Sequence, residues 1–270
     1  MRLRSIIAIP ASLGGIDEAL ESAADALLFT LADSSRDVSE LRNGVAEALG
    51  RVAERGKAGL AVVNHPRTKL LRDDLDAILS PALRGVLVPH AVEPQDVRDA
   101  AVLLREFELK RNIEPGSVTL YPVIDTARGM LKAEGIAAAA PRVGGLAFHT
   151  RRYAHDIGGR DEQRGERLAY GRGKVVAVSR AYGHAPMVYT DGLELTYLAE
   201  TGFASAILPE PRYVVNANAL FAPSPASKEF ATRARVAYAR PKGESADVAR
   251  RDQTVSHGRT AHKARHILEE

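Results

Sequence analysis

Acidic, imidazole and guanidinium side chains follow two of the apolar segments in this chain, at the point where each segment ends. Asp125 closes one segment and is followed by Arg128, and His149 closes another and is followed by Arg151 and Arg152. A carboxylate that ends a buried apolar strand costs free energy unless it is paired or coordinated. Imidazole suits proton transfer near neutral pH, and guanidinium groups bind carboxylates. These residues indicate proton transfer on a small anion, although a solvated loop is an equal explanation for Arg151 and Arg152.

Three further polar residues follow apolar segments in the same way. His90 comes directly after an apolar segment and is a second candidate for moving a proton. Asp33 precedes two serines and is as typical of a helix cap as of a site. Asn64 precedes a His-Pro pair, where simple turn chemistry is an equal alternative. The full set of polar residues at segment ends is Ser12, Asp33, Asn64, His90, Asp125, Arg128, His149, Arg151, Arg152, Asp191, Glu210 and Arg212.

The segments that must position these side chains are short, apolar at nearly every position, and separated by stretches of helical period. They are Ser5–Pro10, Ala26–Ala32, Gly59–Asn64, Gly85–Pro89, Thr119–Asp125, Val143–His149, Ala185–Thr190 and Ala204–Pro209. Such strands are typical of parallel sheets that are covered on both faces. Between them, Ser39–Gly56 and Gln95–Lys110 place apolar residues on one helical face. Repeated β–α units, without a nucleotide-binding glycine pattern, favour a closed (β/α)8 TIM barrel, whose chemistry lies where its strands end.

The pattern changes after the last predicted strand. We expect the barrel to span residues 1–222 and a C-terminal helical extension to span residues 223–270. Val214–Phe221, Ala226–Ala239 and Arg259–Glu270 predict helices, and the polar segment Pro241–Ser245 predicts a linker. Because this linker is so polar, we expect the extension to pack on a neighbouring subunit rather than on its own barrel.

The composition excludes several classes of protein. The 270 residues include no Cys, which excludes disulfides, a thiolate nucleophile, iron–sulfur ligation and a cysteine zinc site. The net charge of +3 is too small for a general nucleic-acid binder. No apolar run approaches the ~20 residues of a membrane helix, and the N-terminus leads directly into the first strand without a signal-like segment. We therefore expect a soluble cytoplasmic protein with no nucleic-acid or membrane partner.

Three short motifs are weak. Gly171-Arg-Gly173-Lys174 resembles part of a phosphate loop, but it lacks the earlier Gly and the following Ser or Thr, so we expect small residues inside an amphipathic helix. His262 and His266 have the spacing of helical metal ligands, but no third ligand is evident. No Gly-x-Ser-x-Gly motif occurs, so the sequence does not support a serine hydrolase.

Several blocks along the chain resemble those of a known family. Arg4-Ser5-Ile-Ile-Ala-Ile-Pro10-Ala-Ser12 is similar to Arg-Ser-x-Leu-Phe-Val-Pro-Gly-Ser, and Ala24-Asp25-Ala-Leu-Leu-Phe-Thr-Leu-Ala32-Asp33 to Ala-Asp-x-x-x-x-Asp-Leu-Glu-Asp. Gly85-Val-Leu-Val-Pro89 is similar to Gly-Ile-Val-Leu-Pro-Lys, and Ile124-Asp125-Thr-Ala-Arg-Gly129 to Ile-Glu-Thr-x-x-Gly. Gly202-Phe203 and Phe221-Ala-Pro223-Ser224 match later landmarks. Together these blocks resemble the HpcH/HpaI aldolase/citrate lyase family, in its citrate lyase beta-subunit-like branch.

This resemblance implies a fold, a reaction and a cofactor. It implies a (β/α)8 barrel that forms a trimer or hexamer and that cleaves or forms a carbon–carbon bond in a malyl, citramalyl or citryl thioester. It further implies a Mg²⁺ ion that is held by two carboxylates and chelates the oxo-acid product, with an Arg on the product carboxylate. A hard cation and a guanidinium both stabilise the enolate charge that such a cleavage develops.

The chain departs from the family pattern at the positions that carry this chemistry. The family Arg of Val-Arg-Ile-Asn falls on Val62, the metal-ligating Glu falls on Asp125, and the second metal carboxylate falls on Arg152. The other differences are Arg151 for a neighbouring Glu, Ala32-Asp33 for an acid pair, His90 for a Lys and Glu210 for a His. A guanidinium cannot ligate Mg²⁺, so an ion pair between Arg152 and Asp125 is predicted at the old metal position.

These considerations lead to one leading hypothesis and two alternatives. The leading hypothesis is a divergent carbon–carbon lyase-type enzyme that acts on an anionic acyl-CoA or 2-oxo acid. A non-catalytic homologue that binds a CoA ester or a protein partner is the first alternative, and a lyase whose metal site is rebuilt from Asp125 and Asp33 is the second. The predicted catalytic residues are Asp125, His90 and Asp33, and the predicted substrate-binding residues are Asn64, Arg128, His149, Arg151 and Arg152. Asp125 is the single predicted ligand of the Mg²⁺ that the family implies, and no organic cofactor is expected.

Overall fold

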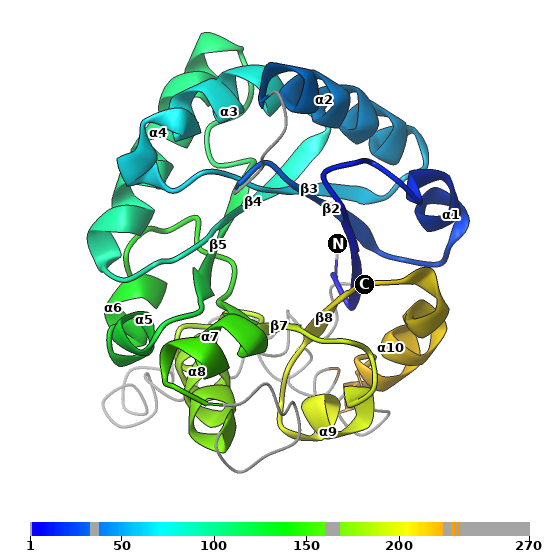
Figure 1. The fold of residues 1–270 in the computed structure, drawn as a ribbon, viewed down its shortest axis with the longest axis vertical. Helices are drawn as coiled ribbons and strands as arrows, with labels where there is room; N and C mark the ends of the chain where they lie inside the picture. The colour runs from blue at the N-terminus through cyan, green and yellow to red at the C-terminus, as the bar shows by residue number, and fades with distance from the viewer. Residues whose placement is uncertain (1, 33–37, 160–167, 224–227, 230–231, 233–270) are drawn as a thin grey trace, which may run out of the picture. The chain divides into compact units, whose positions relative to one another are not determined.

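Eight parallel strands close into a barrel within one compact unit, Leu3–Phe221 (Figure 1). The computed structural model describes residues 2–32, 38–159, 168–223, 228–229 and 232. The strands are β1 (Ser5–Ile9), β2 (Ala26–Thr30), β3 (Ala58–Val62), β4 (Leu83–Val88), β5 (Thr119–Ile124), β6 (Ala147–His149), β7 (Met187–Tyr189) and β8 (Ser205–Leu208). Each strand pairs with its sequence neighbours, and β8 returns to β1, with Ser5 opposite Ala206. The predicted barrel is therefore confirmed.

The helices lie outside the ring of strands (Figure 1). They are α1 (Ile16–Glu21), α2 (Val38–Glu54), α3 (Leu70–Ile78), α4 (Pro94–Lys110), α5 (Ala127–Leu131), α6 (Ala133–Ala137), α7 (Thr150–Asp156), α8 (Ala169–Ala181), α9 (Leu195–Glu200) and α10 (Val214–Leu220), with short 3-10 helices η1 (Pro66–Thr68) and η3 (Pro211–Tyr213). The two helices predicted before β3 and before β5 are present as α2 and α4. Gly171 and Gly173 lie inside α8, as expected for small residues of a helix.

Two apolar clusters hold the barrel together, because alternate side chains of each strand face opposite sides of the sheet. Residues such as Leu28, Leu60 and Val123 fill the inside of the barrel. A larger cluster, which includes Phe29 and Val86, packs the outside of the strands against the helices. Both faces of the strands are buried, and this is why the strands appear in the sequence as unbroken apolar runs.

Some of the predictions concern residues that the structure does not describe. The C-terminal extension of residues 223–270 falls almost wholly beyond the described residues, so its helices and its place of packing stay predictions. Asp33, His262 and His266 also lie outside them. Within the described part of the chain, no helix is both long and apolar enough to cross a membrane.

Candidate functional site

A histidine and a buried carboxylate meet at the C-terminal end of the barrel. His90 follows β4 and Asp125 follows β5, so two neighbouring strands deliver them to the same place. His90 Nδ1 lies 2.9 Å from Asp125 Oδ2, and the side chain of Asp125 is 0% exposed. The same oxygen accepts a longer hydrogen bond of 3.4 Å from the backbone N–H of His90. One carboxylate oxygen therefore holds both the ring and the backbone of His90.

The backbone of His90 is in an unusual conformation. Its φ of 51° lies in the left-handed region, which a residue with a Cβ seldom adopts and which costs on the order of 1 kcal/mol. The helix α5 packs against the loop that carries His90, and this contact requires a glycine. A Cβ on Gly129 of α5 would overlap the carbonyl oxygen of Ala91. Close packing and the two bonds to Asp125 together fix where the imidazole points.

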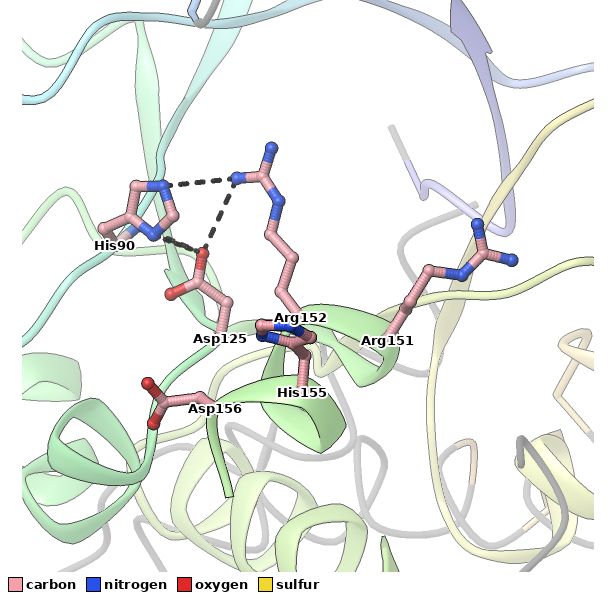
Figure 2. A pocket seen from close by; sticks show the side chains of 6 residues that line it. All are labelled: His90, Asp125, Arg151, Arg152, His155 and Asp156. Carbon is pink, nitrogen blue, oxygen red and sulfur yellow. Dashed lines mark hydrogen bonds and ion pairs between the residues drawn. The ribbon is translucent and has the colours of Figure 1, made fainter. Parts of the chain in front are cut away.

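Arg152 completes the arrangement from α7. Its Nη1 lies 3.8 Å from Asp125 Oδ2 and 3.4 Å from His90 Nε2, and Figure 2 shows the guanidinium extending from α7 toward His90. The predicted ion pair between Arg152 and Asp125 is present. Because Asp125 accepts from the Nδ1–H of His90, the ring tautomer that fits has its lone pair on Nε2, facing Arg152.

These side chains line a pocket of about 490 Å³. Its lining residues are His90, Asp125, Arg151, Arg152, His155 and Asp156 (Figure 2). One carboxylate oxygen of Asp156 already has a partner, because its Oδ2 accepts a 2.6 Å hydrogen bond from the backbone N–H of Ala127. Asp125 is fully buried whereas the side chain of Arg152 is 42% exposed, so an entering ligand meets the guanidinium before the carboxylate. This order favours the binding of an anion.

His149 positions Arg152 instead of moving a proton at neutral pH. It is the N-cap of α7, where its Nδ1 accepts the backbone N–H of Arg152 at 3.4 Å, and its ring stacks on Tyr189 with 4.4 Å between centroids. Burial, reinforced by the charge of Arg152, lowers the pKa of His149 to about 4. The ring is therefore neutral near pH 7, as the cap requires, and too weak a base for that pH.

Three of the predicted binding residues, namely Asn64, Arg128 and His149, are not among the residues that line this pocket. Asn64 is buried, and its side-chain amide donates to Asp74 at 2.8 Å and to the carbonyl of Leu31 at 3.4 Å. Arg128 is exposed and pairs with Glu93 at 2.9 Å. His90, Asp125, Arg151 and Arg152 are brought together by the structure, whereas the lining includes neither Asn64 nor Arg128, and His149 contributes only as the N-cap of α7.

The sequence reasoning missed two lining residues, His155 and Asp156. Both are on α7, three and four residues after Arg152, so they share a helical face with it. Helical spacing from His149 onward was the signal that could have found them. A second missed group lies at the neighbouring strand end, where Asp96 lies 2.6 Å from Arg67 and 3.6 Å from His65. Burial lowers the pKa of His65, which therefore stays neutral beside this carboxylate.

The described residues do not fit the Mg²⁺ that the family implies. Asp125 Oδ1 is buried without a hydrogen-bond partner and is the one atom suited to a cation, but Oδ2 is shared by His90 and Arg152. Among the residues that the structure describes, no group of three or more His, Asp or Glu side chains could hold a metal ion. Mg²⁺ requires near-octahedral oxygen ligands. A guanidinium about 4 Å from a divalent ion opposes it by roughly 8 kcal/mol at an effective dielectric constant of about 20.

Comparisons with known proteins agree on the family. The chain is 29% identical over 252 residues to a (3S)-malyl-CoA thioesterase of Cereibacter sphaeroides, covering 87% of this chain and 82% of that protein. It is 27% identical to the citrate lyase subunit beta of Escherichia coli K12, covering 92% and 84%.

Solved structures agree on the fold. The M. tuberculosis citrate lyase beta subunit, complexed with oxaloacetate and magnesium, aligns with a TM-score of 0.64 at 18% identity, covering 82% of this chain and 98% of that one. A HpcH/HpaI aldolase/citrate lyase family protein of Burkholderia cenocepacia aligns with a TM-score of 0.65 at 18% identity, covering 81% and 92%. The HpcH/HpaI aldolase/citrate lyase family model matches residues 12–205. The chain therefore belongs to the HpcH/HpaI aldolase/citrate lyase family.

Proposed function

We propose that this protein is a carbon–carbon lyase-type enzyme that acts on a small carboxylated acyl thioester, such as an acyl-CoA, or on a 2-oxo acid. The observation that carries the proposal is the contact of His90 with both Asp125 and Arg152 inside one pocket. The relatives named citrate lyase subunit beta and (3S)-malyl-CoA thioesterase support a substrate of this class.

Anion binding falls to the arginines of α7. Arg152 extends toward His90, whereas Arg151, which also lines the pocket, points away from His90 (Figure 2). A guanidinium binds a carboxylate through two parallel N–H donors and keeps its charge at every pH relevant to an enzyme. The substrate carboxylate would bind Arg152, with Arg151 adding positive charge at the entrance.

Proton transfer falls to the pair of His90 and Asp125. In the cleavage direction, Nε2 of His90 takes the proton of the substrate β-hydroxyl, and the bond between the α and β carbons breaks. The β carbon leaves as the carbonyl of an oxo acid, and the electron pair passes to the thioester as an enolate. The imidazolium then protonates the α carbon, so that atoms and charge balance. Asp125 holds the ring in the required tautomer, and Arg152 stabilises the developing negative charge.

Thioester hydrolysis is a second candidate that one observation favours. A histidine oriented by a buried carboxylate can also activate water, and the relative at 29% identity is named a thioesterase. In that reaction water attacks the thioester carbonyl, the thiolate leaves, and the proton passes through His90 to the sulfur. The same pocket serves both reactions, and their products distinguish them.

The test measures both products from one set of incubations. Purified protein is mixed with malyl-CoA, citramalyl-CoA or citryl-CoA, and the oxo acid and free thiol are quantified separately. Lyase activity yields an oxo acid and a new acyl-CoA without free thiol, whereas hydrolysis yields free thiol without an oxo acid. We expect His90→Gln and Arg152→Gln to lower the rate at least about 100-fold. Arg105→Gln, at an exposed position of α4 that is not part of the pocket lining, is the matched control and should keep the rate.

The non-catalytic alternative predicts a different result. A binding protein would form neither product, yet its melting temperature would rise with an acyl-CoA, because a ligand of the native state stabilises it by mass action. A protein partner that co-purifies in stoichiometric amount would assign a subunit role. Absence of both products from all three thioesters would refute an enzyme that acts on these acyl thioesters.

A further inference from the structure

We propose that the guanidinium of Arg152 is a built-in replacement for a divalent cation in this pocket, so that the protein binds carboxylates without metal and becomes a metal-binding protein when this one charge is reversed. The inference concerns what the pocket binds. It therefore holds or fails independently of whether the protein turns over a thioester.

The position of the charge is the first argument. Nη1 of Arg152 lies 3.8 Å from Asp125 Oδ2, while the other oxygen, Oδ1, is buried and has no hydrogen-bond partner. A buried carboxylate with one unsatisfied oxygen is a strong ligand for a cation, because it retains electron density that no donor compensates. The cation that the structure supplies beside this carboxylate is a guanidinium.

The anchoring of Arg152 is the second argument. Its backbone N–H is held by the Nδ1 of His149 at 3.4 Å, and its Nη1 also meets Nε2 of His90 at 3.4 Å. The guanidinium therefore contacts the residues that follow β4 and β5, and the last residue of β6 caps the helix that carries it. The positive charge of Arg152, held in this way, repels a second cation from Asp125. The Arg152 side chain is also partly exposed, so the same charge is accessible from solvent.

The two kinds of cation differ in what they demand of a ligand. A site with a metal ion binds a carboxylate only when the ion is present, so chelators abolish binding. A guanidinium is covalently part of the chain, and its bidentate pairing with a carboxylate is insensitive to chelators. The expected ligand is therefore a small carboxylate that pairs directly with Arg152.

The experiment measures metal and anion binding without any turnover. Mn²⁺ serves as a paramagnetic substitute for Mg²⁺, and malonate serves as an unreactive dicarboxylate. For the wild-type protein we expect no stoichiometric Mn²⁺ binding by electron paramagnetic resonance. We also expect malonate to raise the melting temperature to the same extent with EDTA and with Mg²⁺. In Arg152→Glu, Mn²⁺ affinity should rise at least about tenfold, and malonate should require the metal.

A matched variant separates position from net charge. Arg151→Glu makes the same change in charge one residue away, with a side chain that points away from Asp125 (Figure 2), and should not gain the Mn²⁺ site. Arg152→Gln, which removes the charge without adding a carboxylate, should lose the stabilisation by malonate and serves if the Glu variant does not fold.

Three results would overturn the inference. The first is stoichiometric Mn²⁺ binding by the wild-type protein that is lost in Asp125→Asn or Asp33→Asn, which would indicate a metal site rebuilt from acidic residues. The second is stabilisation by malonate that needs Mg²⁺ in the wild type. The third is a folded Arg152→Glu that gains no Mn²⁺ affinity, which would show that the guanidinium does not occupy a cation position.

Discussion

At the level of single residues, His90 and Asp125 have different roles in their pair. Asp125 is fully buried and has two contacts to His90, through Nδ1 and through the backbone N–H. The histidine is more exposed and presents Nε2 to the pocket. The carboxylate therefore orients the ring, and the ring meets the ligand, as expected of a positioning residue and a proton carrier.

Replacing Asp125 by Asn tests these roles. The amide keeps the shape and still accepts a hydrogen bond, but it removes the negative charge that balances Arg152 and that stabilises an imidazolium. We expect the rate to fall about 100-fold or more and the free energy of unfolding to fall by about 1–2 kcal/mol, since Arg152 is exposed enough to be solvated. Rates and urea denaturation check this, with Asp99→Asn on α4 as control. An unchanged rate would remove Asp125 from the mechanism.

The lowered pKa of His149 gives a prediction about stability and pH. The unfolded chain takes up this proton near pH 6.5, whereas the native protein does so only near pH 4. The free energy of unfolding therefore has its full value, as far as His149 is concerned, above pH 6.5. It decreases as the pH falls toward 4, by about 3 kcal/mol at most.

His149→Asn keeps an N-cap but removes the titration. Urea denaturation between pH 7 and pH 4.5 should show a smaller loss of stability for the variant than for the wild type. Equal losses would mean that other groups carry the pH dependence. His65, whose pKa burial also lowers, is the first other group to test.

At the level of elements, a glycine brings α5 against the loop of His90. A Cβ on Gly129 would overlap the backbone carbonyl of Ala91, and a backbone atom cannot move aside as a flexible side chain does. We expect Gly129→Ala to cost about 1–3 kcal/mol of stability and to lower activity by displacing His90. Gly173→Ala is the matched control, because α8 leaves open space there and the helix should gain about 0.5–1 kcal/mol. A Gly129→Ala protein as stable as the wild type would contradict this account.

The positions of the strands could be predicted because both of their faces are buried. The apolar run that ends at Asp125 and the one that precedes His90 needed no knowledge of the partner strands, and a barrel places successive strand ends on one rim. The boundaries of β6 were predicted less well. The segment expected to begin at Val143 pairs as a strand only from Ala147, and Val143 makes just an isolated bridge with Leu120.

The side chains at the rim could be predicted only in part. Asn64 follows β3 as expected, but the buried carboxylate of Asp74, on a helix ten residues later, binds both its backbone and side-chain N–H groups. The hydrogen bonds between Asn64 and Asp74 depend on how the helix of Asp74 packs, and a local sequence pattern does not predict that packing. His155 was missed for a related reason, since α7 begins immediately after β6 where a solvated loop was an equal interpretation.

For the whole molecule, the boundary of the folded unit can be tested by truncation. Asn218 of α10 accepts a 2.7 Å hydrogen bond from the hydroxyl of Ser5 and donates one of 2.7 Å to the carbonyl of Ala23. These bonds tie the last helix of the compact unit to β1 and to the segment between α1 and β2. A chain that ends at Phe221 should therefore unfold cooperatively in urea with a midpoint close to that of the full chain, because it keeps every one of these contacts.

A chain that ends at Tyr213 provides the contrast, because it lacks α10 and exposes the apolar face that Val214 and Ala217 bury. It should lose several kcal/mol of stability or fail to fold, because the apolar surface that α10 covers is left exposed to water. The chain that ends at Phe221 also tests the predicted role of residues 223–270. If that extension packs on a neighbouring subunit, light scattering should show the full chain as a trimer or hexamer and the truncated chain as a particle with fewer subunits. If both chains form oligomers with the same number of subunits, the subunit contacts lie on the barrel itself.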